Sequence, residues 1–176
     1  MESSRDLISS ARIGDKVAFE KLLQPHIASA AKLAYAMLLD RTEAEDVVQE
    51  AALSAWRRLE NVRDGEDFKP WFLGIVANRC RTVRRGSWWS VVRMAGAPMT
   101  SYPSPEERLV RGADLRSALA ALSADQRAAI LLHFYLDLPL QDVARALEIS
   151  VAGVKSRINR ALKRLRPVLR ADEESV

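Results

Sequence analysis

Two stretches of the sequence carry arginine and lysine without a single acidic residue, and both have the pattern of an amphipathic helix. One runs from Asn78 to Arg93 and the other from Val151 to Arg170. Apolar residues recur at helical spacing along the chain, and no window alternates with period two. The sequence therefore predicts an all-α protein. Basic helices at two separate places are typical of a protein that touches nucleic acid twice.

The composition argues against several classes of protein. The net charge is only +4 over 176 residues, so positive charge matters only where it is clustered. Cys80 is the single cysteine, which excludes an internal disulfide and fits a reducing, cytoplasmic compartment. We interpret Cys80 as core packing rather than as a redox group. No glycine-rich phosphate loop, zinc ligand set or membrane-length apolar run is present, so we predict no cofactor, no metal site and no enzymatic activity.

Glycine and proline cluster between Gly86 and Pro105, which predicts a linker between two helical modules. We predict an N-terminal domain over residues 1–86, a flexible linker over 87–105, a C-terminal domain over 106–170 and a tail over 171–176. The expected helices are Ser4–Ile13, Lys16–Leu39, Glu43–Leu59 and Pro70–Arg85 in the first domain, then Glu106–Leu122, Ala124–Leu136, Leu140–Leu147 and Val151–Arg166 in the second.

The third expected helix has two distinct faces. Thr42 at its start and Glu45 three residues later predict a capping box. Opposite its apolar stripe lie polar residues and one leucine, namely Asp46, Gln49, Glu50 and Leu53. This leucine is either a solitary surface residue or the apolar anchor of a protein-binding face.

The fourth expected helix also presents a polar side, formed by Gly74, Ala77, Asn78, Arg81 and Arg85. Arg79 falls on the apolar stripe instead. A buried guanidinium needs a carboxylate, so we expect an ion pair with Asp46 or Glu50 there. The polar segment Glu60–Lys69 before this helix is either a recognition loop or a plain connector.

The pattern near the C-terminus predicts a helix-turn-helix. Leu140–Leu147 forms a short helix, a break of about three residues follows, and Ser150 is a good N-cap for the next helix. The exposed side of that second helix offers Ala152, Lys155, Ser156, Arg157, Asn159, Arg160 and Lys163. Such a helix fits the major groove of DNA, although a solvated basic face on an ordinary helical hairpin is the alternative.

Three motifs resemble the conserved segments of bacterial sigma factors. The run from Thr42 to Glu50 with Trp56 looks like the core-binding segment of region 2, and Phe68–Arg79 looks like its promoter-melting helix. Leu122–Arg127, Asp142–Ala144 and Val154–Ala161 look like region 4. In order and spacing, the three are similar to the extracytoplasmic-function (ECF) group of the sigma-70 family.

The resemblance implies specific roles for the residues that match. The residues Asp46, Gln49, Glu50 and Leu53 would contact RNA polymerase core. The minus-ten element of promoter DNA would be opened and read by Asn61, Arg63, Asp64, Trp71, Ala77, Asn78, Arg81 and Arg85. The exposed side of the helix-turn-helix would read the minus-thirty-five element. An anti-sigma factor is a further expected partner, able to hold the protein at the membrane from the cytoplasmic side.

Two features depart from the family pattern. Glu148 stands where the turn of the helix-turn-helix usually has glycine, and Pro139 replaces a small polar residue. If position 148 needs a positive φ, its side chain costs about 1 kcal/mol. Trp88 and Trp89 open the predicted linker without a known family role.

Two other classes of function remain open from the residues alone. A stand-alone helix-turn-helix regulator would explain the basic C-terminal helix, but such proteins generally dimerise and do not need the face around Leu53. A helical enzyme or RNA-binding protein is the third class, and the sequence lacks a clustered catalytic constellation for it.

Overall fold

The computed structural model describes residues 3–62, 67–93 and 116–173, with side chains up to residue 84 in the second range and up to residue 167 in the third. These residues form helices and no strand. The N-terminal half contains α1 (Ser4–Arg12), α2 (Lys16–Leu38), α3 (Arg41–Arg57), the 3₁₀ turn η1 (Leu59–Asn61) and α4 (Phe68–Arg93). The C-terminal half contains a helical segment at 116–121, α6 (Ala124–Ile130) with its π-helical continuation η2 (Leu131–Tyr135), α7 (Leu140–Ala146) and α8 (Val151–Glu173).

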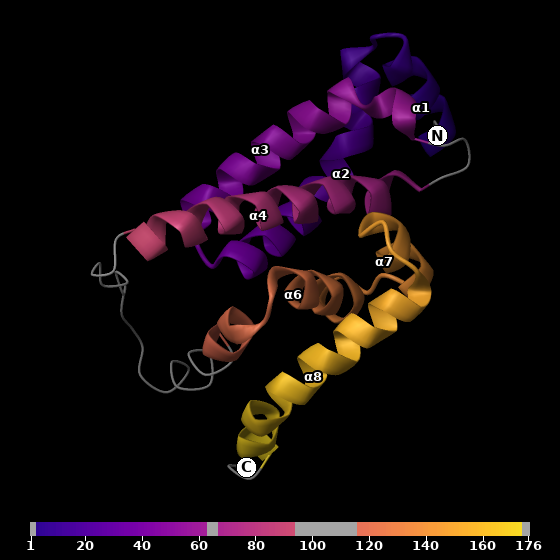
Figure 1. The fold of residues 1–176 in the computed structure, drawn as a ribbon. Coiled ribbons are helices and arrows are strands. Elements are labelled where there is room, and N and C mark those ends of the chain that lie inside the picture. The colour runs from indigo at the N-terminus through magenta and orange to yellow at the C-terminus, as the bar shows by residue number, and fades with distance from the viewer. Residues whose placement is uncertain (1–2, 63–66, 94–115, 174–176) are drawn as a thin grey trace.

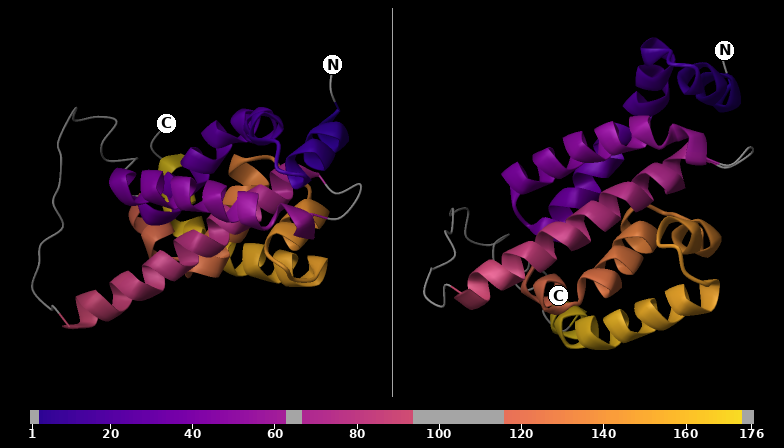
Figure 2. Two further views of the ribbon diagram at one scale, coloured as in Figure 1. Left: turned by 90° about the horizontal axis from the view of Figure 1, so that it is seen from above. Right: turned by 45° about the horizontal axis from the view of Figure 1, so that its top comes forward.

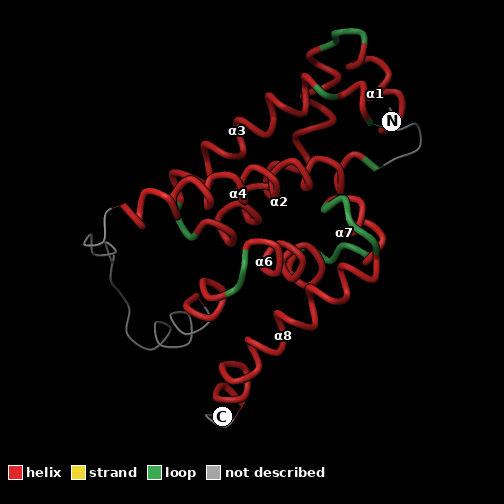
Figure 3. Tube along the Cα trace, in the orientation of Figure 1, coloured by secondary structure: helices red, strands yellow, loops and turns green. Residues whose placement is uncertain are grey.

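Helix α4 lies in the middle of the molecule (Figure 1). On one side it packs against α2 and α3, and on the other side against α6 and α7. Helix α8 covers α6 and α7 on the side away from α4, as the two further views in Figure 2 and the trace in Figure 3 also show. The largest apolar cluster extends without a break from Ile8 in α1 to Ile158 in α8. The two halves therefore share one core.

The described parts of the predicted helices are helical, but several of their ends differ, and residues 106–115 of the expected helix Glu106–Leu122 lie outside the described residues. Helix α3 begins at Arg41, and its N-cap is Asp40, whose carboxylate accepts the amide of Glu43 at 2.8 Å. The predicted cap at Thr42 is therefore wrong, because the aspartate two residues earlier already satisfies the free amides of the first turn. Glu45 instead forms an ion pair of 2.9 Å with Arg41.

Helix α4 is longer at both ends than the sequence predicted. It begins at Phe68, with Pro70 in its first turn, where the missing amide costs nothing. The ring of Phe68 stacks on that of Phe72 with 5.8 Å between centroids, which anchors this start. At the other end the helix continues through Gly86 to Arg93. The first residues of the expected linker are therefore helical, and the rest of it lies outside the described residues.

The helix-turn-helix has the predicted local geometry. The hydroxyl of Ser150 accepts the amide of Gly153 at 3.1 Å, as expected for the N-cap of α8. The chain turns sharply before it, and Glu148 has a φ of 54°. That value lies in the left-handed region, which a residue with a Cβ enters only at a cost.

The predicted inward-facing and outward-facing residues are largely confirmed. Val47, Ala51 and Ala55 of α3 are buried, whereas Leu53 on the opposite side is 58% exposed. Arg79 forms the expected ion pair with Glu50, at 3.1 Å, but its side chain is 44% exposed. The partner was therefore predicted correctly and the burial was not, because the long side chain carries the guanidinium out of the core.

Replacing Glu148 by glycine should stabilise the protein. The change removes the Cβ penalty at a positive φ and should raise the free energy of unfolding by roughly 0.5–1 kcal/mol. Chemical denaturation monitored by circular dichroism measures this difference. Glu148→Gln is the matched control, because it removes the charge and keeps the Cβ. Equal stabilisation by both variants would mean that the charge, and not the backbone conformation, is responsible.

Candidate nucleic-acid interface

The side of α4 predicted to contact DNA is covered in this structure. Gly74 lies directly against α7, and a Cβ built on it would come within 2.4 Å of the carbonyl oxygen of Ala146. Ala77, one turn further along, is fully buried. The absence of a side chain at Gly74 therefore permits the two helix backbones to touch.

A carboxylate at the start of α6 connects the two basic helices. Asp125 Oδ1 lies 2.7 Å from Nη1 of Arg81 on α4 and 3.7 Å from Nη1 of Arg157 on α8. The two arginine side chains are only 18% and 23% exposed. Arg81 also donates to the side-chain oxygen of Asn78 within α4. One acidic group therefore faces an arginine from each of the acid-free stretches.

Two further arginines lie near each other in the same interface, and no described carboxylate forms an ion pair with either. Arg127 is 1% exposed and donates from Nη1 to the backbone oxygen of Met37 at 2.6 Å, near the C-terminal end of α2. Its Nε and Nη2, together with Nη1 of Arg84, are buried and have no hydrogen-bond partner among the described residues. Burial and the neighbouring charge of Arg84 lower the pKa of Arg127 to about 10. Both groups remain cations near neutral pH, so they repel each other.

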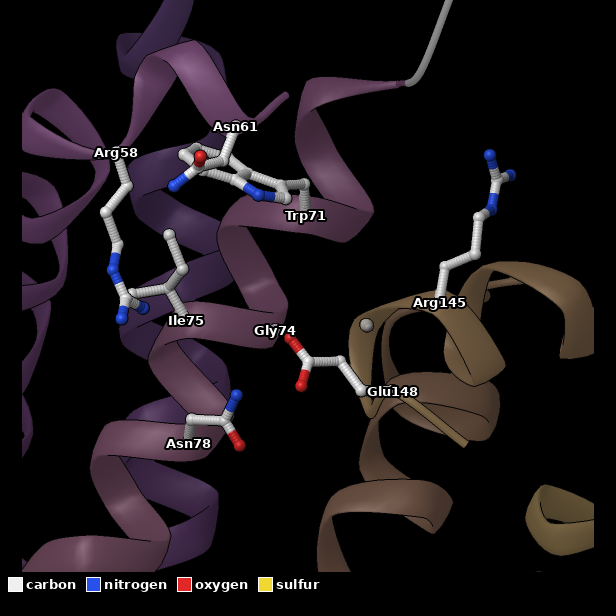
Figure 4. A pocket seen from close by; sticks show the side chains of 9 residues that line it. Arg58, Asn61, Trp71, Gly74, Ile75, Asn78, Arg145 and Glu148 are labelled. Atoms are coloured by element: carbon white, nitrogen blue, oxygen red, sulfur yellow. The ribbon is translucent and has the colours of Figure 1, made fainter. Parts of the chain in front are cut away.

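A polar cleft opens between the halves beside Gly74 (Figure 4). Asn61, Trp71 and Asn78 line it from the N-terminal half, and Arg145 and Glu148 line it from the C-terminal half. In Figure 4 the carboxylate of Glu148 points toward α4, whereas the indole of Trp71 lies beside Asn61. Candidate minus-ten residues therefore share a cleft with the turn of the helix-turn-helix.

The exposed side of α8 matches the prediction in its geometry. Lys155, Ser156, Asn159, Arg160 and Lys163 are exposed, as is Ala152, whereas Arg157 is partly covered. Arg160 donates to the hydroxyl of Ser156 at 2.9 Å, so these two side chains are linked along the helix. Cationic and hydrogen-bonding groups on one exposed helix face suit phosphates and base edges.

The face around Leu53 is also open to solvent. Asp46, Gln49 and Glu50 are exposed beside it. A groove next to this leucine is lined by Glu50, Ser54, Arg57, Arg58 and Arg79. An exposed leucine with charged groups around a groove fits a protein-binding face better than a solitary surface residue.

Some predicted site residues lie outside the description. Arg63 and Asp64 fall within residues 63–66, outside the described residues, and Arg85 is described only as helical backbone. The sequence reasoning missed Asp125 and Arg127. An acid in the first turn of a helix is common, so Asp125 carried no local signal, and Arg127 is buried only because α2 and α4 pack on it. Arg127 does, however, lie in a segment that the family resemblance already included.

Cys80 is buried, and desolvation raises the pKa of its thiol to about 12. This environment fits the interpretation as core packing, since the reactive thiolate is disfavoured. Within the described ranges, no group of three or more histidine, cysteine or acidic side chains is placed to hold a metal ion. None of the described helices is both long and apolar enough to span a membrane.

Comparison with known proteins identifies the family. The model of sigma-70 region 2 matches residues 22–90, and the model of sigma-70 region 4 matches residues 113–165. The chain therefore belongs to the sigma-70 family of RNA polymerase sigma factors, in its ECF group. Members of this family are sigma factors and not enzymes.

The similarity to individual relatives extends over nearly the whole chain. The sigma factor CnrH of Cupriavidus metallidurans is 27% identical over 98% of this chain and 97% of its own length. The ECF sigma factor SigL of Mycobacterium tuberculosis is 29% identical over 92% of this chain and 94% of its own.

Two solved structures of relatives, each in a complex, share the fold. One is CnrH with the cytosolic domain of CnrY, with a TM-score of 0.74 and 26% identity over 97% of this chain and 99% of that one. The other is RpoE with the anti-sigma factor NepR from Bartonella quintana, with a TM-score of 0.69 and 27% identity over 88% of this chain and 98% of that one.

The thiol of Cys80 should resist modification in the folded protein. With its pKa raised to about 12, the thiol stays protonated at pH 8, and burial blocks access as well. An aromatic disulfide reagent should therefore react with the native protein at least about a hundredfold more slowly than with the protein in denaturant. The absorbance of the released thiolate measures both rates. Rapid reaction of the native protein at pH 8 would contradict the burial of Cys80.

Proposed function

We propose that this protein directs RNA polymerase core to specific promoters and starts transcription there, without an enzymatic activity of its own. The observation that carries the proposal is the presence of both family regions in one chain, each with an exposed face of suitable chemistry. Region 2 presents the face around Leu53, and region 4 presents the exposed side of α8.

Helix α8 reads the minus-thirty-five element as duplex DNA in this proposal. Its first turns, with Ala152, Lys155 and Ser156, face the base edges, as does Asn159. The later Arg160 and Lys163 face phosphates. The support is their common exposure on one side of a capped helix. Arg157 joins them once its ion pair with Asp125 is released.

The minus-ten element is opened and read by region 2. The residues assigned to it are Asn61, Arg63, Asp64, Trp71, Ala77, Asn78, Arg81 and Arg85. Taking a base out of the stack costs a few kcal/mol, which contacts in a pocket and with aromatic rings offset. Because α6 and α7 cover the DNA side of α4 here, reading the minus-ten element requires the two halves to separate.

An anti-sigma factor is the proposed inhibitory partner. The support is the likeness of the whole chain to sigma factors held by such inhibitors, namely CnrH with CnrY and RpoE with NepR. The protein works in the bacterial cytoplasm in this proposal, where an inhibitor with a membrane segment would hold it at the membrane.

Run-off transcription tests the proposal directly. Purified protein and core polymerase are incubated with a library of promoter fragments, and the transcripts are sequenced. We expect initiation from a small set of related promoters, and none from core alone. A stand-alone regulator would instead bind its site as a dimer and leave core polymerase inactive on the library. Gel filtration and binding to isolated core polymerase separate the two classes further.

Leu53→Asp should abolish the interaction with polymerase and leave the fold intact. Leu53 is 58% exposed, and surface substitutions usually change the free energy of unfolding by about 0.5 kcal/mol or less. A charge at the centre of an apolar contact should weaken binding to core polymerase at least about tenfold. Fluorescence anisotropy of labelled protein measures the affinity. Val17→Asp is the matched control, since Val17 is 60% exposed and lies on α2, outside the face around Leu53. Normal core binding by Leu53→Asp would remove this residue from the interface.

Substitutions along α8 should separate affinity from sequence preference. Ser156→Ala and Asn159→Ala should change which minus-thirty-five bases are selected, because these side chains lie early enough to reach base edges. Arg160→Ala and Lys163→Ala should weaken all promoters alike and lower the salt dependence, as expected for phosphate contacts. Selection from a randomised minus-thirty-five library distinguishes the two outcomes. An unchanged base preference in the Ser156 and Asn159 variants would refute their assignment.

A further inference from the structure

The contact between the two halves involves residues that bind DNA in the proposed function. We call the packing of α4 against α6 and α7 the closed arrangement. It covers Ala77 and places Arg81 at the edge of the interface, where 18% of its side chain remains exposed. The exposed face of α8 stays open, except that Arg157 is drawn toward Asp125.

We propose that Asp125 acts as an intramolecular substitute for DNA phosphate. In the closed arrangement its carboxylate holds Arg81 of region 2 and Arg157 of region 4. DNA phosphates compete with this carboxylate for the same two guanidinium groups. This inference rests on the proposed function and adds a device that regulates it. A carboxylate and a phosphate present similar anionic oxygens to a guanidinium. Both arginines come from the acid-free stretches of the chain.

Asp125 lies where it can link the two halves through an ion pair. It lies in the first turn of α6, where the helix dipole favours a negative charge. Its ion pair with Arg81 crosses from one half to the other, whereas its contact with Arg157 stays within the C-terminal half. Separation of the halves therefore breaks the stronger of the two contacts and frees Arg81 together with the buried face of α4.

The remaining contacts show which groups oppose the closed arrangement. Arg127 and Arg84 are buried near each other, and three of their nitrogens have no hydrogen-bond partner. An uncompensated cation in an interface opposes its closure. Asp125 thus supplies an ion pair that crosses the described interface, and its loss should shift the balance toward the open form.

A distance measurement on the free protein tests this proposal without polymerase. Dyes are attached at Glu20→Cys in α2 and Arg166→Cys in α8, both exposed positions in different halves, while buried Cys80 stays unlabelled. In this background Asp125→Asn should lower the energy transfer between the dyes. Because a partly exposed ion pair shifts an equilibrium by about two- to fivefold, the closed-to-open ratio should fall by that factor at low salt.

Two variants control for other causes. Asp142→Asn changes the charge of the same half equally, but Asp142 pairs with Arg145 inside α7 and does not cross the interface, so energy transfer should stay as in the parent. Gly74→Ala opens the interface without changing charge, since its Cβ would meet the Ala146 carbonyl at 2.4 Å, and it should lower energy transfer as Asp125→Asn does. Alanine is favoured over glycine inside a helix, so α4 itself is not weakened.

DNA binding provides the second measurement. A labelled single-stranded oligonucleotide of mixed sequence should bind Asp125→Asn about two- to fivefold more tightly than the parent at low salt, and Asp142→Asn less so. Added salt should open the parent protein and reduce its difference from Asp125→Asn. Energy transfer of the labelled parent over the same salt range measures this opening without any change at Asp125, and circular dichroism checks that each variant is folded.

The results divide clearly. Lower energy transfer in Asp125→Asn and Gly74→Ala, but not in Asp142→Asn, supports the proposal. Unchanged transfer in Asp125→Asn overturns it, as does an equal loss in all three variants. Tighter DNA binding by Asp125→Asn without a change in energy transfer also overturns the proposal, because the loss of the negative charge then acts only on local DNA contacts. Failure of the proposed function would appear instead as a lack of run-off transcription, whatever the energy transfer.

Discussion

The burial of α4 on both sides is the constraint on which the rest of the structure depends. Its apolar stripe packs against α2 and α3, and its opposite side packs against α6 and α7. Gly74 permits the second contact because its lack of a side chain lets two backbones touch. A helix covered on two sides joins both halves into one core, and the side of α4 that we propose contacts DNA, which includes Ala77, is covered in that core.

The charges at this interface oppose the packing that the apolar residues favour. Apolar burial is non-directional, so it holds the halves together without demanding one exact register. Arg81 and Arg157 share a single acid of α6, and Arg84 and Arg127 are buried near each other. A protein built to remain closed would neutralise such groups or replace them with apolar ones. Arginines with incomplete hydrogen bonding at the interface lower the cost of the opening toward DNA that we propose.

Local features of the sequence were predictable because they depend on neighbouring residues. The exposure of Leu53 and the cap at Ser150 follow from helix periodicity and capping chemistry, whereas the positive φ of Glu148 was raised only by the resemblance to a family with glycine at this turn. Errors arose where two local signals competed or a tertiary contact intervened. Asp40, and not Thr42, is the N-cap of α3. Helix α4 continues beyond Gly86, where the glycine predicted a helix end. A single glycine costs a helix only about 1 kcal/mol, which neighbouring turns can offset.

The sequence by itself determined the helical class, the two basic stretches, the helix-turn-helix and, through its resemblance to a family, the kind of function. These depend on periodicity and on motifs that lie within short segments. Only the tertiary structure decided that α6 and α7 cover the side of α4 that we propose contacts DNA, that Asp125 meets Arg81 forty-four positions away, and that Arg127 is buried against Met37. Contacts between residues so distant in the chain leave no trace in local patterns, because any exposed acid or arginine is compatible with its own helix.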